Sequence, residues 1–198
     1  MRKSQKSPSK VNSNEKPKSP SNRNNNQNIQ SRNDNTLIGK NFNSNTLGLL
    51  VGTSNSKYVS AKYIAGNNMY LKKVLKYTIR NAQNFVKSYE GTKPDIVAYQ
   101  LTCNYLKENP LEKIVEDMDS LINETNTAFG EKPIVISLPL PRSKYYLNKK
   151  AQQLSFETTS KLSRHVNVTF SNNSNLMYRG NPVDGIMYDR KHLSQWGT

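Results

Sequence analysis

The sequence predicts a three-layer α/β/α domain with about five parallel strands, preceded by a disordered tail. Between residues 46 and 170, short apolar segments of strand length alternate with longer segments whose apolar residues recur at helical spacing. This alternation is typical of parallel strands connected by helices that pack on the sheet. The first 45 residues lack such segments, and 198 residues are enough for one domain of ordinary size plus a tail.

The tail, residues 1–45, is rich in Asn, Ser, Lys and Pro and carries almost no large apolar side chains. It buries too little surface to offset the entropy of ordering, and we therefore expect it to be disordered. Nine basic and two acidic residues give it +7 of the chain's formal net charge of +15. This charge predicts weak binding of polyanions rather than recognition of a nucleic-acid sequence. The predicted domain, residues 46–198, is also basic.

The first half of the domain contains two predicted strands and two predicted helices. The apolar run 47–51 ends at Gly52 and is typical of a strand buried on both faces. A short helix is expected over 56–63 and a second strand over 70–77. Thr78 can cap the next helix, because its hydroxyl can accept a hydrogen bond from the first turn. That helix has apolar residues at helical spacing, namely Ile79, Ala82, Phe85, Val86 and Tyr89.

The second half contains three more strands and two longer helices. Residues 96–99 predict the third strand, and Pro110 stands in the first turn of a strongly amphipathic helix. Strands are expected over 134–138 and 166–170, with a helix over 147–163 between them. The apolar face of the helix after Pro110 consists of Ile114, Val115, Met118, Leu121 and Ile122.

Candidate chemistry lies at the ends of strands, where parallel sheets place their ligand sites. Ser54 follows the first strand, and Asn104 follows the third. Asp189 precedes His192 by three residues, a spacing that can place both side chains on one face of a helical turn. The carboxylate could then accept the imidazole Nδ1–H and leave Nε2 as a base. The serine would supply the nucleophile.

The order of these residues resembles the SGNH, or GDSL-type, hydrolase family. The resemblance covers the domain and rests on Gly-x-Ser at 52–54, on the asparagine within 101–106, and above all on Asp-x-x-His-Leu with a following glycine at 189–197. It implies the flavodoxin-like fold of that family and an esterase or acetylesterase activity on a small ester, without a cofactor or a metal. The implied site residues are Ser54 as nucleophile, His192 as base, Asp189 as its orienting partner, and Asn104 and Ser54 in the oxyanion hole.

Four positions depart from the family's motifs. Thr53 stands where the family has the aspartate beside the nucleophile. Thr102 replaces the glycine of the asparagine block, and Tyr105 replaces the aspartate that follows the asparagine. The glycine whose N–H helps to form the oxyanion hole is missing after the second strand. The N–H of Lys76 or Tyr77 is expected to take its place.

Several alternatives stay open. Ser54 could be an ordinary helix N-cap, and Asp189 with His192 a structural pair in a surface turn. The leading hypothesis is a serine hydrolase. The competing ones are a catalytically silent binding module of the same fold, with weak affinity for nucleic acid, and a relic of a mobile element. Family members continue with a helix after the glycine that matches Gly197, and this helix packs beside the first strand. If the chain ends at Thr198, apolar surface beside residues 47–51 is exposed, and the domain is then marginally stable, dimeric or a fragment of a longer product.

Other residues receive structural assignments. His165 closes a helix rich in Lys and Arg, where a cation is favourable, and Cys103 is expected in the core. A single cysteine excludes an internal disulfide and suits a reducing compartment. The sequence shows no metal-ligand spacing and no glycine-rich phosphate loop. It also shows no secretory signal and no apolar run of about 20 residues, so we expect an intracellular protein that does not bind membranes.

Overall fold

A computed structural model describes residues 46–57, 59–65, 69–179, 181–187 and 192–194. The tail that was predicted to be disordered lies outside the described residues, and so does Asp189. Ser54, Asn104 and His192 are all described.

Five strands form one parallel sheet in the order β2-β1-β3-β4-β5. They are β1 Thr46–Gly52, β2 Met69–Leu75, β3 Ile96–Gln100, β4 Ile134–Ser137 and β5 Val168–Ser171. The α-helices between them are α1 Ala61–Ala65, α2 Ile79–Lys87, α3 Leu111–Phe129 and α4 Tyr145–Leu162. This strand order is the flavodoxin-like one, and the predicted fold class is confirmed.

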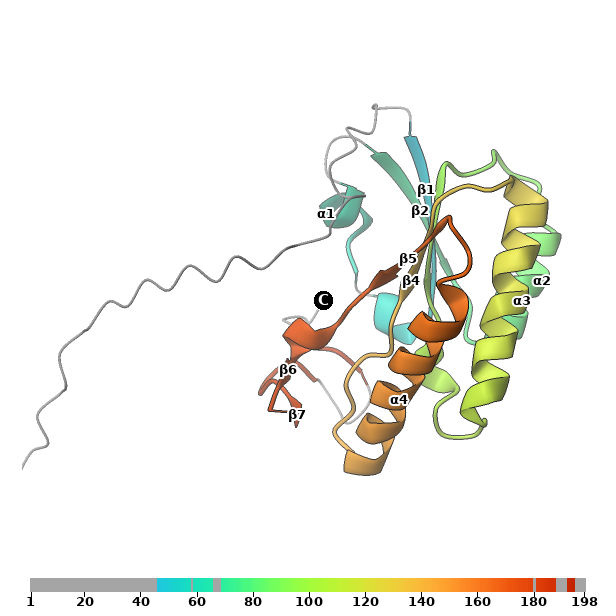
Figure 1. Cartoon of the computed structure of the whole chain (residues 1–198). Coiled ribbons are helices and arrows are strands. Elements are labelled where there is room, and N and C mark those ends of the chain that lie inside the picture. The colour runs from blue at the N-terminus through green and yellow to red at the C-terminus, as the bar shows by residue number, and fades with distance from the viewer. Residues whose placement is uncertain (1–45, 58, 66–68, 180, 188–191, 195–198) are drawn as a thin grey trace, which may run out of the picture. The chain divides into compact units, whose positions relative to one another are not determined.

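Helices α2, α3 and α4 cover one face of the sheet, and α1 lies on the other (Figure 1). The connection from β1 to β2 runs along the sheet in the direction opposite to the later connections. Because such crossovers are right-handed, α1 is placed on the opposite face. Helices α2, α3 and α4 begin at the edge where the strands end, so loops that are distant in sequence meet there (Figure 1).

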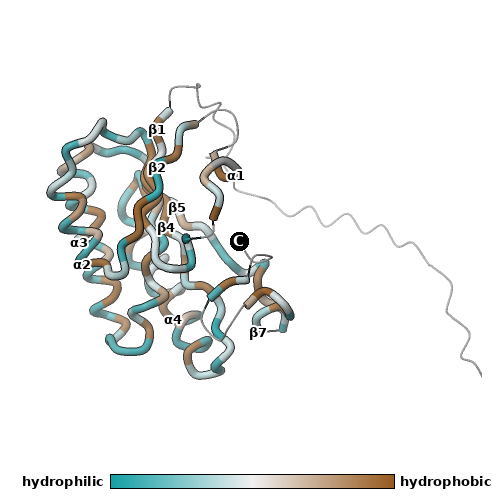
Figure 2. The backbone as a smooth tube through the Cα atoms, turned by 180° about the vertical axis from the view of Figure 1, so that it is seen from behind, coloured by the Kyte–Doolittle hydropathy of each residue, from teal (hydrophilic) through white to brown (hydrophobic). Residues whose placement is uncertain are grey.

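The core lies between the sheet and helices α2 to α4. Val97 and Tyr99 of β3 are fully buried on this side, and they alternate with less buried neighbours. The Tyr99 hydroxyl lies 2.6 Å from the hydroxyl of Thr125, which donates to the Leu121 carbonyl. Burial raises the pKa of Tyr99. Figure 2 shows hydrophobic residues gathered along the strands and alternating with hydrophilic ones along the helices.

Local signals explain where the helices begin. The Thr78 side chain accepts a hydrogen bond from the Asn81 N–H at 3.0 Å, as predicted for an N-cap. Pro110 is the residue before α3 rather than a member of its first turn. Proline is suited to either position. Its fixed φ is compatible with both, and neither position needs the N–H that proline lacks.

Two segments differ from the sequence-based expectation. The single short helix expected over 56–63 is a 3₁₀ turn, η1 Ser54–Ser56, followed by the separate helix α1. After β5 comes a further turn, η3 Ser174–Leu176, and a small antiparallel pair, β6 Met177–Tyr178 with β7 Asn181–Pro182. The sequence predicted no structure there, because two-residue strands leave no readable periodicity.

Candidate active site

The turn that carries Ser54 follows β1 directly. Gly52 ends the strand, and a Cβ placed on it would lie 2.0 Å from the Ser56 hydroxyl oxygen. The glycine is therefore required by the tight return of the chain over the strand end. Thr53 is extended and completely buried, whereas Ser54 is partly exposed. This local geometry presents the Ser54 hydroxyl at the edge of the sheet.

His192 reaches this hydroxyl from the far end of the chain. Its Nε2 lies 3.1 Å from Ser54 Oγ, across 138 positions of sequence. The next residue, Leu193, donates its N–H to the side-chain oxygen of Asn55 at 3.1 Å. Leu193 also pairs in an antiparallel bridge with Met187. The segment that carries the histidine is thus tied to the serine turn by the imidazole contact and by the hydrogen bond of the next residue.

Asn104 ends a second 3₁₀ turn, η2 Thr102–Asn104, after β3. Its Nδ2 donates to the Tyr77 carbonyl at 3.1 Å, which ties η2 to the loop after β2. Its Oδ1 is buried and has no hydrogen-bond partner within the described part of the chain. The Lys76 N–H donates to the Gly52 carbonyl at 2.8 Å. The N–H groups of Lys76 and Tyr77 were the two backbone donors expected for the oxyanion hole. The N–H of Lys76 is therefore already used in a hydrogen bond.

The structure brings together two of the predicted site residues, Ser54 and His192, and places Asn104 at the end of the neighbouring strand. The Asp189 carboxylate lies outside the described residues. The substituted positions have partners of their own. Tyr105, which replaces an aspartate, accepts hydrogen bonds at its hydroxyl from the N–H groups of Ile79 (3.1 Å) and Arg80 (3.5 Å), and so satisfies the start of α2.

Gln100 is a central residue that the sequence analysis missed. Its Oε1 accepts from the hydroxyls of Thr53 at 3.1 Å and Ser56 at 2.9 Å. Its Nε2 lies 3.6 Å from the sulfur of Cys103, which is buried as predicted. One amide therefore links the turn of Ser54 to the turn of Asn104. The only signal in the sequence is a polar residue at the end of an otherwise apolar strand.

A buried arginine supports the same turn from the next loop. Arg142 is only 4% exposed, and its Nη2 donates to the Cys103 carbonyl. Its backbone N–H donates to Asn148 Oδ1 at 3.1 Å, which holds the loop after β4 against α4. A buried cation with charge-assisted hydrogen bonds is costly to remove, so this residue fixes the backbone just before Asn104. The sequence analysis did not identify it.

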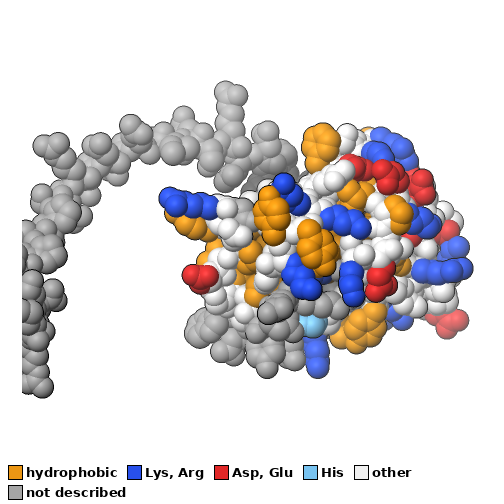
Figure 3. Space-filling view, turned by 90° about the horizontal axis from the view of Figure 1, so that it is seen from below, with side chains coloured by type: hydrophobic (Ala, Val, Ile, Leu, Met, Phe, Trp, Pro, Cys, Tyr) orange, Lys and Arg blue, Asp and Glu red, His pale blue; other side chains and the backbone are white. Residues whose placement is uncertain are grey.

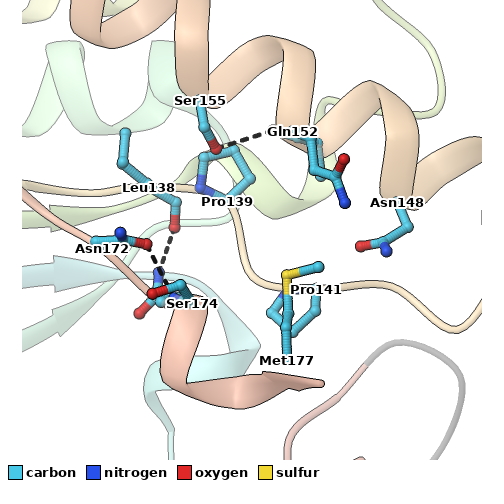
Figure 4. Close-up of a pocket in the computed structure, with 11 residues that line it drawn as sticks. Leu138, Pro139, Pro141, Asn148, Gln152, Ser155, Asn172, Ser174 and Met177 are labelled. Atoms are coloured by element: carbon cyan, nitrogen blue, oxygen red, sulfur yellow. Dashed lines mark hydrogen bonds between the residues drawn. The ribbon is translucent and has the colours of Figure 1, made fainter. Parts of the chain in front are cut away.

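A cavity of about 230 Å³ opens beside this region, between the loop after β4, helix α4 and the segment after β5 (Figure 4). Its lining is uncharged and mixes apolar residues, among them Pro139, Pro141 and Met177, with polar ones such as Asn148 and Gln152. Ser54, Asn104 and His192 are not among its lining residues. No group of three or more His, Cys, Asp or Glu side chains that could hold a metal is found within the described ranges.

Solved structures with this fold were found by comparison. A Streptococcus pneumoniae protein, provisionally assigned as a platelet activating factor, is 16% identical, with 81% of each chain covered and a TM-score of 0.65. A member of the lipolytic G-D-S-L family from Veillonella parvula is 10% identical, with 77% of this chain and 92% of that chain covered and a TM-score of 0.62. A carbohydrate esterase of family 3 from Talaromyces cellulolyticus is 14% identical, with 77% and 90% covered and a TM-score of 0.59.

These findings show that the chain has the fold of the SGNH hydrolase-like superfamily. The resemblance seen in the sequence is thereby confirmed at the level of fold. No protein-family model and no curated protein matched the sequence. Among the described helices, none has the length and apolar character needed to span a membrane.

Proposed function

We propose that this protein is a serine hydrolase that cleaves a small ester. The observation that carries the proposal is the 3.1 Å contact between His192 Nε2 and Ser54 Oγ at the edge of an SGNH-like sheet. A serine hydroxyl becomes a useful nucleophile when a base within hydrogen-bonding distance takes its proton. The compared structures include proteins titled as an esterase and as lipolytic, which supports ester hydrolysis as the reaction class.

In the proposed reaction, His192 accepts the hydroxyl proton as Ser54 Oγ attacks the ester carbonyl carbon. The tetrahedral oxyanion collapses, the C–O bond to the alcohol breaks, and the imidazolium returns its proton to the leaving oxygen. Water activated by the same imidazole then hydrolyses the acyl-serine. Asp189 is proposed to accept the Nδ1–H of the ring and so to fix its tautomer.

The oxyanion would be stabilised by the side-chain amide of Asn104 and by backbone N–H groups. The amide has two N–H donors, and one is fixed on the Tyr77 carbonyl. The second is left for a developing negative charge, and the first holds the group in place before the substrate arrives. Because Lys76 donates to Gly52, we propose the N–H groups of Ser54 and Tyr77 as the backbone donors.

A fluorophosphonate probe and 4-nitrophenyl acetate test the proposal. The unmodified chain should label at Ser54 and release nitrophenol. Ser54→Ala should abolish labelling and lower turnover by about 10³-fold or more. Ser60→Ala is the matched control, because Ser60 is exposed and lies in the same connection. Equal labelling of Ser54→Ala and the unmodified chain would contradict the proposal.

A second candidate function is binding of single-stranded nucleic acid without turnover. Two exposed tyrosines each have a cation over the ring, with Lys149 Nζ 4.9 Å from the Tyr145 centroid and Arg179 5.2 Å from that of Tyr178. Stacked bases and phosphates are held by such pairs. Affinity for an unstructured RNA oligonucleotide should then fall with salt and with Tyr145→Ala. Salt-independent, negligible affinity would exclude this function.

A further inference from the structure

The two edges of the sheet differ in charge. The loops that follow the strands, 53–60, 76–78, 101–110, 138–144 and 172–187, carry six basic and two acidic side chains among their described residues, a net charge of +4. The basic residues are Lys57, Lys76, Lys107, Arg142, Lys144 and Arg179. The described loops at the opposite edge, 88–95, 130–133 and 163–167, carry three basic and three acidic residues with histidine counted as neutral, a net charge of zero.

These cations lie at the edge that carries Ser54 and His192. Figure 3 views the molecule from this side and shows Lys and Arg side chains interleaved with hydrophobic ones around a histidine. Lys57, Lys107, Lys144 and Arg179 are exposed, as are Glu108 and Asp184, so the exposed side chains of this edge carry a net charge of +2 into the solvent. The positive potential is therefore located where the proposed ester would enter.

Helix formation does not explain this placement. The first turns of α2 and α4 lie at this edge, and the positive end of a helix dipole favours acidic residues there. Neither helix has an acidic residue in its first turn. Arg80 instead lies in the first turn of α2, and Lys144 is the N-cap residue of α4. Helix α3, which begins at the same edge, has Glu112 in its first turn. At α2 and α4, however, the cations add to the dipoles instead of compensating them, which points to an anionic ligand.

We propose that the ester hydrolysed at Ser54 carries a negative charge, a carboxylate or a phosphate, on its acyl or its alcohol part. This inference rests on the proposed serine-hydrolase function and names its substrate class. A cleft edge of one sign concentrates ligands of the opposite sign and raises their association rate by about 10–10³-fold at low salt. The preference should appear in kcat/KM and should weaken as salt screens it.

Matched substrates separate charge from shape. For the acyl side, 4-nitrophenyl hemisuccinate and 4-nitrophenyl butyrate share the leaving group and the number of acyl carbons. For the alcohol side, 1-acetylglycerol 3-phosphate is compared with 1-acetylglycerol. We expect the anionic member of at least one pair to have a kcat/KM about 10-fold higher at about 10 mM salt, and a ratio near one at about 1 M salt. The pair that shows it distinguishes the carboxylate from the phosphate.

Charge-removing variants locate the effect on the molecule. Lys144→Gln with Arg179→Gln removes two charges from the edge of Ser54. Lys93→Gln with Lys132→Gln removes two from the opposite edge and is the control. The first variant should lower the anionic-to-neutral ratio of kcat/KM by about 3-fold or more, and the second should leave it unchanged. Thermal unfolding of both variants verifies that they are folded.

Three results would overturn the inference. Equal kcat/KM within both pairs at every salt concentration would remove the charge preference while leaving the hydrolase in place. Hydrolysis of none of the four esters would overturn the proposed function as well. Single-stranded RNA could strongly inhibit butyrate hydrolysis while butyrate and hemisuccinate react at equal rates. This result would show that the basic edge binds a polyanionic polymer instead of a charged ester.

Discussion

The side chain of Gln100 joins the two turns that carry the proposed nucleophile and the proposed oxyanion donor. Its single acceptor oxygen receives two hydroxyl donors, from Thr53 and Ser56. Thr53 occupies the position of the aspartate in the family's Gly-Asp-Ser motif. The hydroxyl that replaces the carboxylate is satisfied internally, so the substitution is compatible with an ordered serine turn.

Replacing Gln100 should loosen both turns. Gln100→Leu keeps the size of the side chain but leaves two buried hydroxyls without their acceptor, which costs about 1–3 kcal/mol of stability. Misplacement of Ser54 should lower kcat by about 10-fold or more with little change in KM. Gln100→Glu is the control, because it keeps the acceptor oxygen and should retain most of the activity. Steady-state kinetics and urea unfolding measure both effects, and a loss in KM alone would contradict the positioning role.

Sequence patterns revealed the residues proposed for the chemistry better than the residues that hold them in place. Ser54 and His192 belong to motifs with recognisable spacing. Gln100 contacts Thr53 across 47 positions, and the Asn55 side chain meets Leu193 across 138. The strand order determines which residues become such partners. A glutamine or an asparagine in a single sequence gives no sign of this role.

Between elements, a small ion cluster connects α3 to the end of α4. Asp119 of α3 lies 2.6 Å from both His165 Nε2 and Arg164 Nη2. Desolvation raises the pKa of the Asp119 carboxyl, but the hydrogen bonds from His165 and Arg164 outweigh it, and the pKa lies below the usual value. The sequence analysis assigned His165 a structural role because of the helix end before it; the partner found in the structure is the Asp119 carboxylate of α3.

This cluster should make stability depend on pH. Because the folded pKa of Asp119 is depressed, its contribution is complete above the unfolded pKa of about 3.9 and is lost as the pH falls through the folded value. Asp119→Asn should cost about 0.5–1 kcal/mol at about pH 7, the range of partly exposed pairs, and almost nothing at about pH 2. Glu116→Gln on the exposed face of the same helix is the control. A constant difference across the acid range of urea unfolding would refute this assignment.

Helices and strands were predicted well where apolar periodicity was strong. Helix α3 carries its expected apolar face against the sheet because burial of that face decides its orientation. Helix α4 begins at Tyr145 rather than at Leu147, since its two exposed tyrosines add no apolar signal. The β6–β7 pair was missed because backbone pairing, not side-chain pattern, defines it.

At the scale of the whole molecule, the buried apolar core of the described residues lies between Leu49 and Leu162. The sheet and the helices that supply it belong to the predicted domain, residues 46–198. The tail, residues 1–45, contributes charge rather than apolar side chains. The tail is therefore expected to add to the attraction to polyanions without adding to the stability of the domain.

Removal of residues 1–45 tests this separation. The shortened chain should unfold within about 2 °C of the full chain, because a free energy difference of 1 kcal/mol already shifts the midpoint of such a domain by about 2–4 °C. Its affinity for heparin or RNA should fall, together with the slope of its salt dependence, since it has lost a net charge of +7. Differential scanning calorimetry and a salt titration measure the two effects. A large drop in the midpoint would show that the tail completes the fold.

The sequence by itself determined the alternation of strands and helices, the fold class, and the residue types of the proposed site, because periodicity and short motifs are local properties. Only the tertiary structure decided that His192 meets Ser54, that Lys76 is unavailable as an oxyanion donor, and that Gln100 and Arg142 hold the surrounding turns. These contacts follow from the parallel order of five strands, which brings every strand end to one edge. The charge difference between the two edges has the same origin. The charges of the loops can be added for each edge only because the strand order assigns every loop to one edge or the other.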